Sequence, residues 1–212
     1  MCNKFSANTS LNDLWTNLPL SLIDLCAFPL SYNVVPGEKA PIVYIDETEI
    51  KVKMMEWGLV PILHSLENKV RFINSEIETI HNNIFFHNLV NQKRCLIPMC
   101  GFYVGDNKVS PQVPYYFYLP YRELFMVAGI WNMTKINRQT IYTFSLLTKE
   151  ADANVKCINK RMPVIVTPAN HQSWLEDSEF EIANLLSAPP LYFYKLGNNT
   201  ALQHLDDYIS LA

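Results

Sequence analysis

The chain has 212 residues, of which 49% are hydrophobic, 17% charged and 12% aromatic, and this composition is that of an ordinary globular protein. Its 17 Lys and Arg against 20 Asp and Glu give a formal net charge of -3. That balance lacks the basic excess typical of nucleic-acid-binding domains, so a nucleic-acid partner would need a locally basic groove.

The cysteines and the apolar residues indicate the compartment. The five cysteines are Cys2, Cys26, Cys95, Cys100 and Cys157. Their odd number, irregular spacing and lack of a C-x-x-C pair argue against a disulfide framework and a zinc knuckle, and predict reduced thiols. Residues 1–30 hold no basic region followed by a long apolar stretch, and no window approaches a membrane span. We therefore expect a soluble cytoplasmic protein with no membrane partner.

Two helices and an extended region are predicted in the first half of the chain. Apolar residues at helical spacing predict a helix over residues 10–26. Prolines and a glycine predict an extended, turn-rich segment over residues 29–41. Alternating residues predict a strand over 50–57, followed by a loop over 58–72. A second helix is predicted over residues 75–90.

The second half is dominated by predicted strands. Runs rich in β-branched and aromatic residues predict strands over residues 95–104, 115–119, 124–131 and 140–147. Residues 105–108 form a plausible hairpin turn. Thr167 and Pro168 predict the start of a short helix that reaches Trp174, followed by an acidic helix over 179–186 and a strand over 191–195. We expect an α+β fold in a single domain, residues 1–212, with a mostly antiparallel, barrel-like β core and flanking helices.

Cys2 is the first residue that offers chemistry. Removal of Met1 would leave Cys2 with a free α-amine, whose pKa lies near ~7.7–8.0, beside a thiol whose pKa lies near ~8.5. Such a 1,2-aminothiol condenses with an aldehyde to an imine, and the thiol then closes a thiazolidine ring. Alternatively, the thiol alone could attack an amide. A cysteine at the second position can also be incidental.

Several short strings stand out, although none is a Ser/His/Asp triad, a P-loop, a Rossmann glycine pattern or a paired-histidine motif. The five histidines have no partner at metal-ligand spacing, so we predict neither a metal nor a cofactor. The strings are Tyr32–Pro36, Trp57–Pro61, Asn74–Thr79, Arg94–Tyr103 and Arg161–Pro163.

Taken together and in order, these strings resemble the SRAP family (SOS response-associated peptidases). Met1–Lys4 is similar to the family's Met-Cys-Gly-Arg start, and Asn33–Pro36 to its Asn-x-x-Pro element. Trp57–Pro61 matches its Trp-Gly-Leu-Ile/Val-Pro string. Asn74–Thr79 is similar to its Asn-Ala-Arg-x-Glu-Thr, and Arg94–Gly105 to its Arg-Cys-Leu-Ile-Pro-x-x-Gly-Phe-Tyr-Glu-Trp. Further matches are residues 128–131, 143–151, 161–165 and 174–175.

The resemblance implies a covalent function. In the family, the N-terminal cysteine, here Cys2, forms a thiazolidine with the ring-opened sugar of an abasic site in single-stranded DNA, and the motif asparagine, here Asn74, hydrogen-bonds the adduct region. The family's catalytic glutamate and histidine fall on Val104 and Asn159, which do not titrate; general acid–base groups typically contribute ~10²–10⁴-fold in rate. An arginine expected near phosphate falls on Glu76. The resemblance implies DNA contacts at Lys4, Asn33, Trp57, Glu78, Thr148 and Arg161.

Three interpretations stay open. The first is an enzyme of the DNA–protein crosslinking, lyase and self-processing peptidase class, acting as a monomer on single-stranded DNA with abasic sites; Cys2 and Asn74 favour it. The second is a non-catalytic SRAP-fold binding module, which Glu76, Val104, Asn159 and the acidic net charge favour. The third is an N-terminal-cysteine amidohydrolase, for which no oxyanion hole is identifiable. The first predicts that one concave pocket brings together Cys2, Trp57, Asn74, Val104, Asn159 and Arg161.

Overall fold

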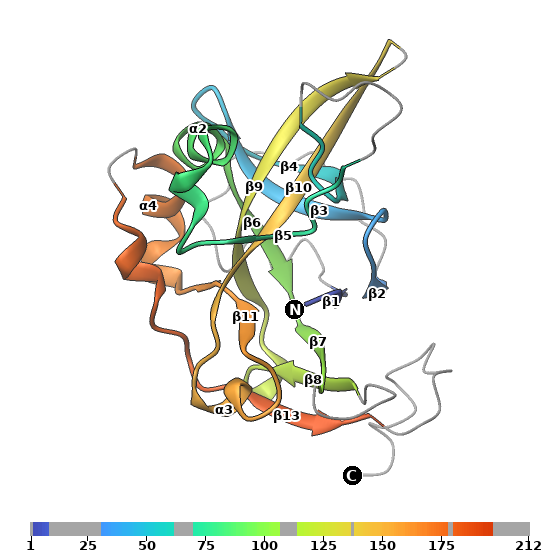
Figure 1. Cartoon of the computed structure of the whole chain (residues 1–212), viewed down its shortest axis with the longest axis vertical. Helices are drawn as coiled ribbons and strands as arrows, with labels where there is room; N and C mark the ends of the chain where they lie inside the picture. The colour runs from blue at the N-terminus through green and yellow to red at the C-terminus, as the bar shows by residue number, and fades with distance from the viewer. Residues whose placement is uncertain are drawn as a thin grey trace.

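The fold is built mainly from strands, with few and short helices between them (Figure 1). The computed structural model describes residues 2–8, 31–61, 70–106, 114–136, 138–177 and 180–196. Strands form where β-branched and aromatic residues are dense, because these side chains pack well on a pleated surface. The predicted α+β class with a mostly antiparallel, barrel-like core is confirmed.

Five strands close into a ring. They are β3 (Lys39–Asp46), β4 (Glu49–Trp57), β6 (Arg94–Met99), β9 (Phe125–Ile136) and β10 (Gln139–Glu150). The ring runs β10-β4-β3-β6-β9 and returns to β10 through an antiparallel β9–β10 ladder. Strand direction cannot alternate around an odd ring, so one pairing must be parallel. That pairing joins β4 to β10, with Trp57 opposite Phe144.

Short strands extend the ring at the far end of β10. β5 (Asn74–Glu76) lies parallel to β10, with Glu76 opposite Thr148. β11 (Arg161–Pro163) lies antiparallel to β10 and places Arg161 opposite Glu150. β12 (Ile165–Val166) pairs with β9. The end of β10 therefore holds β5 and β11 close together, although their sequences are far apart.

A second, antiparallel sheet packs against the barrel. In spatial order its strands are β13 (Tyr192–Lys195), β8 (Pro114–Tyr118), β7 (Gly101–Gly105), β1 (Lys4–Ala7) and β2 (Ser31–Val34). The chain leaves the barrel at Met99 and enters this sheet at Gly101, so the single strand predicted over residues 95–104 is two strands. The prediction missed the break because residues 94–99 and 101–104 are all buried and read as one apolar run.

Two hydrophobic clusters lie on opposite faces of the barrel strands, because successive side chains of a strand point to opposite sides. One cluster joins alternate barrel residues, such as Ile97 and Val127, to residues of the second sheet such as Phe5. The other lies beneath helices α2 (Ile84–Gln92) and α4 (His171–Glu176). Helices cannot fit inside the ring, so the first cluster fills the barrel interior. In the view of Figure 1, α2 and α4 lie at left, and β1 and β2 at right.

The helix predicted over residues 75–90 is wrong in its first half. The backbone of Asn74–Glu76 pairs with β10 as β5, and the Ile77 N–H donates to the Thr148 carbonyl at 2.9 Å. A 3₁₀ turn, η1 (Ile80–Asn82), follows, and α2 begins only after Asn83, whose side chain accepts from the Phe85 N–H at 2.9 Å. Pairing with a distant strand overrode the local helical pattern.

Of the remaining predicted elements, some are confirmed, one is shorter than predicted, and some lie outside the described residues. The strand predicted over 191–195 is confirmed as β13, and Pro168 opens a 3₁₀ turn, η3 (Pro168–Asn170), that continues into α4. The acidic helix predicted over 179–186 is a short 3₁₀ turn, η4 (Ile182–Leu185). The helix predicted over 10–26 and the tip of the hairpin at 105–108 lie outside the described residues. The remaining short elements are η2 (Pro120–Arg122) and α3 (Ala153–Lys156).

Within the described residues, no helix is both long enough and apolar enough to span a membrane.

Candidate functional site

Cys2 and Asn74 meet directly, although they are 72 residues apart in the sequence. The Asn74 side-chain amide donates from Nδ2 to the Cys2 carbonyl oxygen at 2.8 Å. Asn74 is fixed by β5, which pairs with β10, and Cys2 precedes β1, which lies between β7 and β2 in the second sheet. The site therefore lies where the barrel and the second sheet adjoin.

The Cys2 thiol is enclosed and protonated. Its side chain has no exposed surface, and Sγ donates to the Lys4 carbonyl at 3.5 Å. Burial raises the pKa of the Cys2 thiol to about 12, and the hydrogen bond to Lys4 offsets this only in part. The thiolate is the nucleophilic form of cysteine, so in this arrangement the thiol is held in its unreactive form at neutral pH.

The Arg161 side chain is held by two neighbours. Its Nη1 and Nη2 donate to Glu78 Oε1 and Oε2 at 3.0 and 2.8 Å, a two-pronged ion pair. Nη2 also donates to the Thr148 carbonyl at 2.7 Å and to Thr148 Oγ1 at 3.2 Å. Burial would raise the pKa of Glu78, yet hydrogen bonds led by that from Arg161 lower it below its ordinary value. Three residues predicted to contact DNA thus form one network, in which the charge of Arg161 is compensated.

Val104 and Asn159 lie at neighbouring positions but carry no acid or base. Val104, on β7, is fully buried in the core. Asn159 donates from Nδ2 to the carbonyl of Gly105, the residue after Val104, at 3.2 Å. Its Oδ1 accepts from the Arg161 N–H at 3.1 Å. Asn159 therefore ties the end of β7 to the start of β11, which is a structural role.

Trp57 belongs to the core. Its indole Nε1 donates to the Ile73 carbonyl at 2.8 Å, and its ring lies between Phe5 and Phe144, with centroid distances of 5.0 and 6.4 Å. The side chain has no exposed surface. Trp57 therefore presents no exposed ring face in this structure, and its contact with DNA stays a prediction.

Lys4, Asn33 and Glu76 lie at the surface of the same region. Lys4 is half-buried on β1, with Nζ 4.4 Å from the centroid of the Tyr103 ring. Asn33 is half-buried on β2. Glu76 is exposed at the end of β5, where its negative charge opposes the approach of phosphate.

Two polar atoms of the site have unused hydrogen-bonding capacity. Among the described residues, Asn74 Oδ1 and Arg161 Nε are buried and have no hydrogen-bond partner. Such groups cost roughly 1–3 kcal/mol each when left unpaired, so they are usually satisfied by water or a ligand. Asn74 Oδ1 is an acceptor and Arg161 Nε is a donor, so together they could hydrogen-bond a polar ligand.

The sequence matches the SOS response associated peptidase (SRAP) family over residues 1–196. The chain belongs to the SRAP family.

Alignments to SRAP relatives cover most of this chain. The chain is 28% identical over 183 residues to the abasic site processing protein YobE of Bacillus subtilis, and the alignment covers 82% of each protein. It is 27% identical over 183 residues to the abasic site processing protein YoqW of the same organism, covering 82% of this chain and 80% of the relative. A crystal structure of a protein from Bacteroides thetaiotaomicron shares the fold, with a TM-score of 0.76, 21% identity and 93% of each chain covered.

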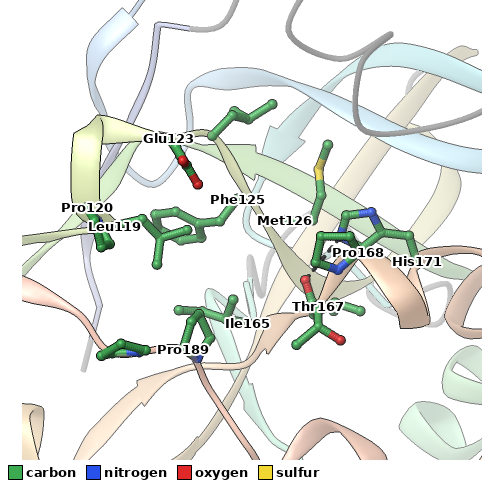
Figure 2. A pocket seen from close by; sticks show the side chains of 13 residues that line it. Leu119, Pro120, Glu123, Phe125, Met126, Ile165, Thr167, Pro168, His171 and Pro189 are labelled. Carbon is green, nitrogen blue, oxygen red and sulfur yellow. Dashed lines mark hydrogen bonds between the residues drawn. The ribbon is translucent and has the colours of Figure 1, made fainter.

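The SRAP chain also contains an apolar cavity of about 310 Å³ that the sequence did not predict (Figure 2). Phe125 and Met126 of β9 and Ile165 of β12 line it, with Thr167 and His171 at one side. The His171 ring is buried and its Nε2 lies 3.0 Å from the Val166 carbonyl. None of the predicted site residues lines this cavity. That they line a common concave pocket of their own stays a prediction.

Two histidines of the SRAP chain meet, contrary to their sequence spacing. His81 Nδ1 and His87 Nδ1 lie 3.1 Å apart because the turn between η1 and α2 brings their rings together. Asn91 Nδ2 lies 3.1 Å from the other ring nitrogen of His87. Within the described residues, no group of three or more His, Cys, Asp or Glu side chains is arranged to hold a metal ion.

Proposed function

We propose that this SRAP protein processes abasic sites in DNA, and that it caps them in single-stranded DNA through a thiazolidine formed by Cys2. The observation that carries the proposal is the 2.8 Å hydrogen bond from Asn74 Nδ2 to the Cys2 carbonyl. It brings together the two residues that the family's chemistry needs. The relatives named abasic site processing proteins support the substrate.

The proposed reaction begins once Met1 is removed and the Cys2 α-amine is free. That amine, with a pKa near ~7.7–8.0, is partly neutral at physiological pH. It adds to the aldehyde carbon of the ring-opened sugar, and loss of one water gives an imine. The Cys2 thiol then adds across the C=N bond, sulfur to carbon and hydrogen to nitrogen. Ring closure neither consumes nor releases a proton overall. The overall reaction therefore starts from the neutral thiol and does not require a thiolate.

Asn74 would position the aminothiol in this reaction. Its Nδ2 holds the Cys2 carbonyl, while its Oδ1 has no partner among the described residues. That oxygen can accept a hydrogen bond from the freed α-amine or from a sugar hydroxyl. Arg161 Nε, likewise unpaired among the described residues, can donate to a phosphate or sugar oxygen.

A second candidate function is a non-catalytic SRAP-fold binding module. The enclosed Cys2 thiol, whose pKa burial raises to about 12, favours it. So do Val104 and Asn159, which cannot transfer protons. The closed form of the sugar must open before it presents an aldehyde, and loss of an acid–base pair typically slows such steps by ~10²–10⁴-fold per group. We therefore expect the covalent reaction to be slow.

The test separates these functions. Protein shown by mass spectrometry to lack Met1 is incubated with a single-stranded oligonucleotide that carries one abasic site, and the products are resolved on a denaturing gel. We expect a heat-stable shifted band with abasic DNA and none with the undamaged oligonucleotide. Cys2→Ala should abolish the band because it removes the sulfur, and retention of Met1 should abolish it because it blocks the amine.

Cys157→Ala is the matched control, because Cys157 is exposed and lies just beyond α3. This variant should keep the full band. A stable band in Cys2→Ala would reject the thiazolidine. Binding of the abasic oligonucleotide without any covalent band would favour the non-catalytic module. Annealing a complementary strand should weaken the band, which tests the preference for single strands. The monomeric state and the cytoplasmic location stay predictions.

A further inference from the structure

His81 and His87 form a pair of imidazoles at the surface, where η1 leads into α2, the helix at upper left in Figure 1. Their Nδ1 atoms lie 3.1 Å apart and their ring centroids 5.1 Å apart. His81 is exposed and His87 is half-buried. On one continuous helix, residues six positions apart would not face each other. The pair therefore exists because the chain turns between η1 and α2.

Backbone hydrogen bonds hold the two histidines at this separation. The Asn82 N–H donates to the Thr79 carbonyl at 2.9 Å within η1, and the His87 N–H donates to the Asn83 carbonyl at 2.9 Å in the first turn of α2. The buried side chain of Ile80 anchors η1 to the protein beneath. Binding a ligand between the rings would therefore require rotation of side chains only, because the backbone already places the rings together.

The separation of the two nitrogens suits ligation of one metal ion. Bonds from a zinc ion to imidazole nitrogen are ~2.0–2.1 Å long, so nitrogens 3.1 Å apart correspond to a nitrogen–metal–nitrogen angle of about 100°. That angle lies between the right angle of octahedral coordination and the larger angle of tetrahedral coordination. In the hydrogen-bonded pair the two nitrogens point at each other, and a small rotation of each ring makes both point at one ion.

The proton positions of the pair follow from Asn91, which lies one turn after His87 on α2. Asn91 Nδ2 is a donor, so His87 Nε2, 3.1 Å away, accepts. Neutral His87 then carries its proton on Nδ1 and donates it to His81 Nδ1. Metal binding requires that this proton move to His87 Nε2. A half-turn of the Asn91 amide presents Oδ1 to the new N–H, and a carbonyl oxygen in that position is the usual support of a metal-bound histidine.

We propose that His81 and His87 bind one divalent transition-metal ion, such as Zn²⁺ or Ni²⁺, through their Nδ1 atoms, with Asn91 as a positioning residue. Imidazole suits these ions, whereas Mg²⁺ and Ca²⁺ take oxygen ligands. Within the described part of the chain no third His, Cys, Asp or Glu side chain joins the pair, so water completes the coordination. The bound ion clamps η1 to α2 and takes no part in the reaction at Cys2.

Calorimetric titration of the full chain with nickel chloride tests the site. We expect saturable binding of one ion to the unmodified protein, and loss of that binding in His81→Ala and in His87→Ala. All cysteines are intact in these variants, so thiol ligation would be unaffected. Nickel should also raise the midpoint of thermal unfolding of the unmodified protein and leave that of His81→Ala unchanged, because an ion that binds only the folded state stabilises it.

Asn91 gives a sharper test, because its two variants should change the affinity in opposite directions. Asn91→Asp supplies a carboxylate to the His87 N–H and should tighten nickel binding. Asn91→Leu removes the acceptor and should weaken binding about tenfold, at the low end of the ~10–100-fold effect of such partners. The matched control is Asn88→Leu, an exposed asparagine on the same helix that follows His87 directly and points elsewhere. Its affinity for nickel should be unchanged.

Three results would overturn the site. One is the absence of saturable nickel binding to the unmodified protein, and another is full binding in either His→Ala variant. The third is an equal affinity of Asn91→Leu and Asn91→Asp. If a His→Ala variant loses its native circular dichroism spectrum, the Asn91 variants decide the question. The crosslinking assay with abasic DNA is run without metal, so its outcome is independent of this site.

Discussion

Glu78 and Arg161 form an ion pair that spans 83 residues of sequence and closes the end of β10. Glu78 also accepts from the Glu150 N–H at 2.8 Å, so one carboxylate links the turn after β5 to β10 and β11. The pair explains why Glu78 is charged where a simple surface turn would need no charge. It also means that the positive charge of Arg161 is already compensated within the protein.

Replacing Glu78 by Gln should lower stability at neutral pH and have little effect in acid. The pKa of Glu78 is lower in the folded protein than in the unfolded chain, so its contribution is fully present above the unfolded pKa and is lost as the pH falls through the folded pKa. Because the carboxylate is 42% exposed, the loss should be no more than about 1 kcal/mol.

Urea unfolding of wild type and Glu78→Gln at pH 7 and pH 3 measures this difference. Glu49→Gln is the control, since Glu49 is 71% exposed and lies 3.6 Å from Lys51. An equal gap between wild type and Glu78→Gln at both pH values would contradict the ion-pair account.

The sequence predicted which residues belong to the candidate site better than it predicted which residues they contact. The motif strings singled out Cys2 and Asn74, and the structure joins them. No pattern indicated that Trp57 is enclosed by Phe5 and Phe144. A tryptophan occurs both in protein cores and on binding faces, so its identity alone does not tell the two apart. Ion pairs such as Glu78 with Arg161 depend on which strands become neighbours, and spacing along the chain does not contain that information.

The strands were predictable because their composition is distinctive, and the exceptions have a common cause. Residues 75–90 carry apolar residues at helical spacing, but β10 offers unpaired backbone groups to Asn74–Glu76 and captures them as β5. Residues 95–104 carry an uninterrupted apolar run that serves two different sheets. In both cases a partner distant in sequence decides the conformation, and local propensity does not record that partner.

Gly129 permits the close approach of β6, β9 and β10. A Cβ at this position would lie 2.3 Å from Ile97 Cδ1, 2.9 Å from the Ser145 carbonyl oxygen and 3.1 Å from Cys95 Sγ. Gly129→Ala should therefore lower the free energy of unfolding by about 1–3 kcal/mol, the usual cost of overpacking a core. Urea unfolding measures the loss.

Two further variants sharpen this prediction. Ile97→Val removes Cδ1, the nearest atom, and should recover part of the stability lost by Gly129→Ala. Met133→Ala, at a position 43% exposed on the same strand, should change stability by less than about 0.5 kcal/mol. Unchanged stability in Gly129→Ala would mean that the three strands can separate there without cost.

The barrel and the second sheet share one hydrophobic cluster, which includes Phe5 and Phe117 from the sheet and Ile97 and Phe144 from the barrel. If either the barrel or the second sheet unfolded, the apolar side chains of the other would be exposed to water. We expect a single cooperative unfolding transition, with tryptophan fluorescence and far-ultraviolet circular dichroism giving coincident curves in urea. Two separated transitions would contradict the prediction of one domain over residues 1–212.

The parallel β4–β10 pairing has a consequence for synthesis on the ribosome. The β3–β4 hairpin can form as soon as it emerges, but the free edge of β4 finds its partner only after Phe144 has been translated. At roughly 5–20 residues per second, the nascent chain carries that edge unpaired for several seconds. An unpaired strand edge is a template for association with other chains. The stage most prone to aggregation is thus the half-made chain, and slower translation ahead of β10 should lower its soluble yield.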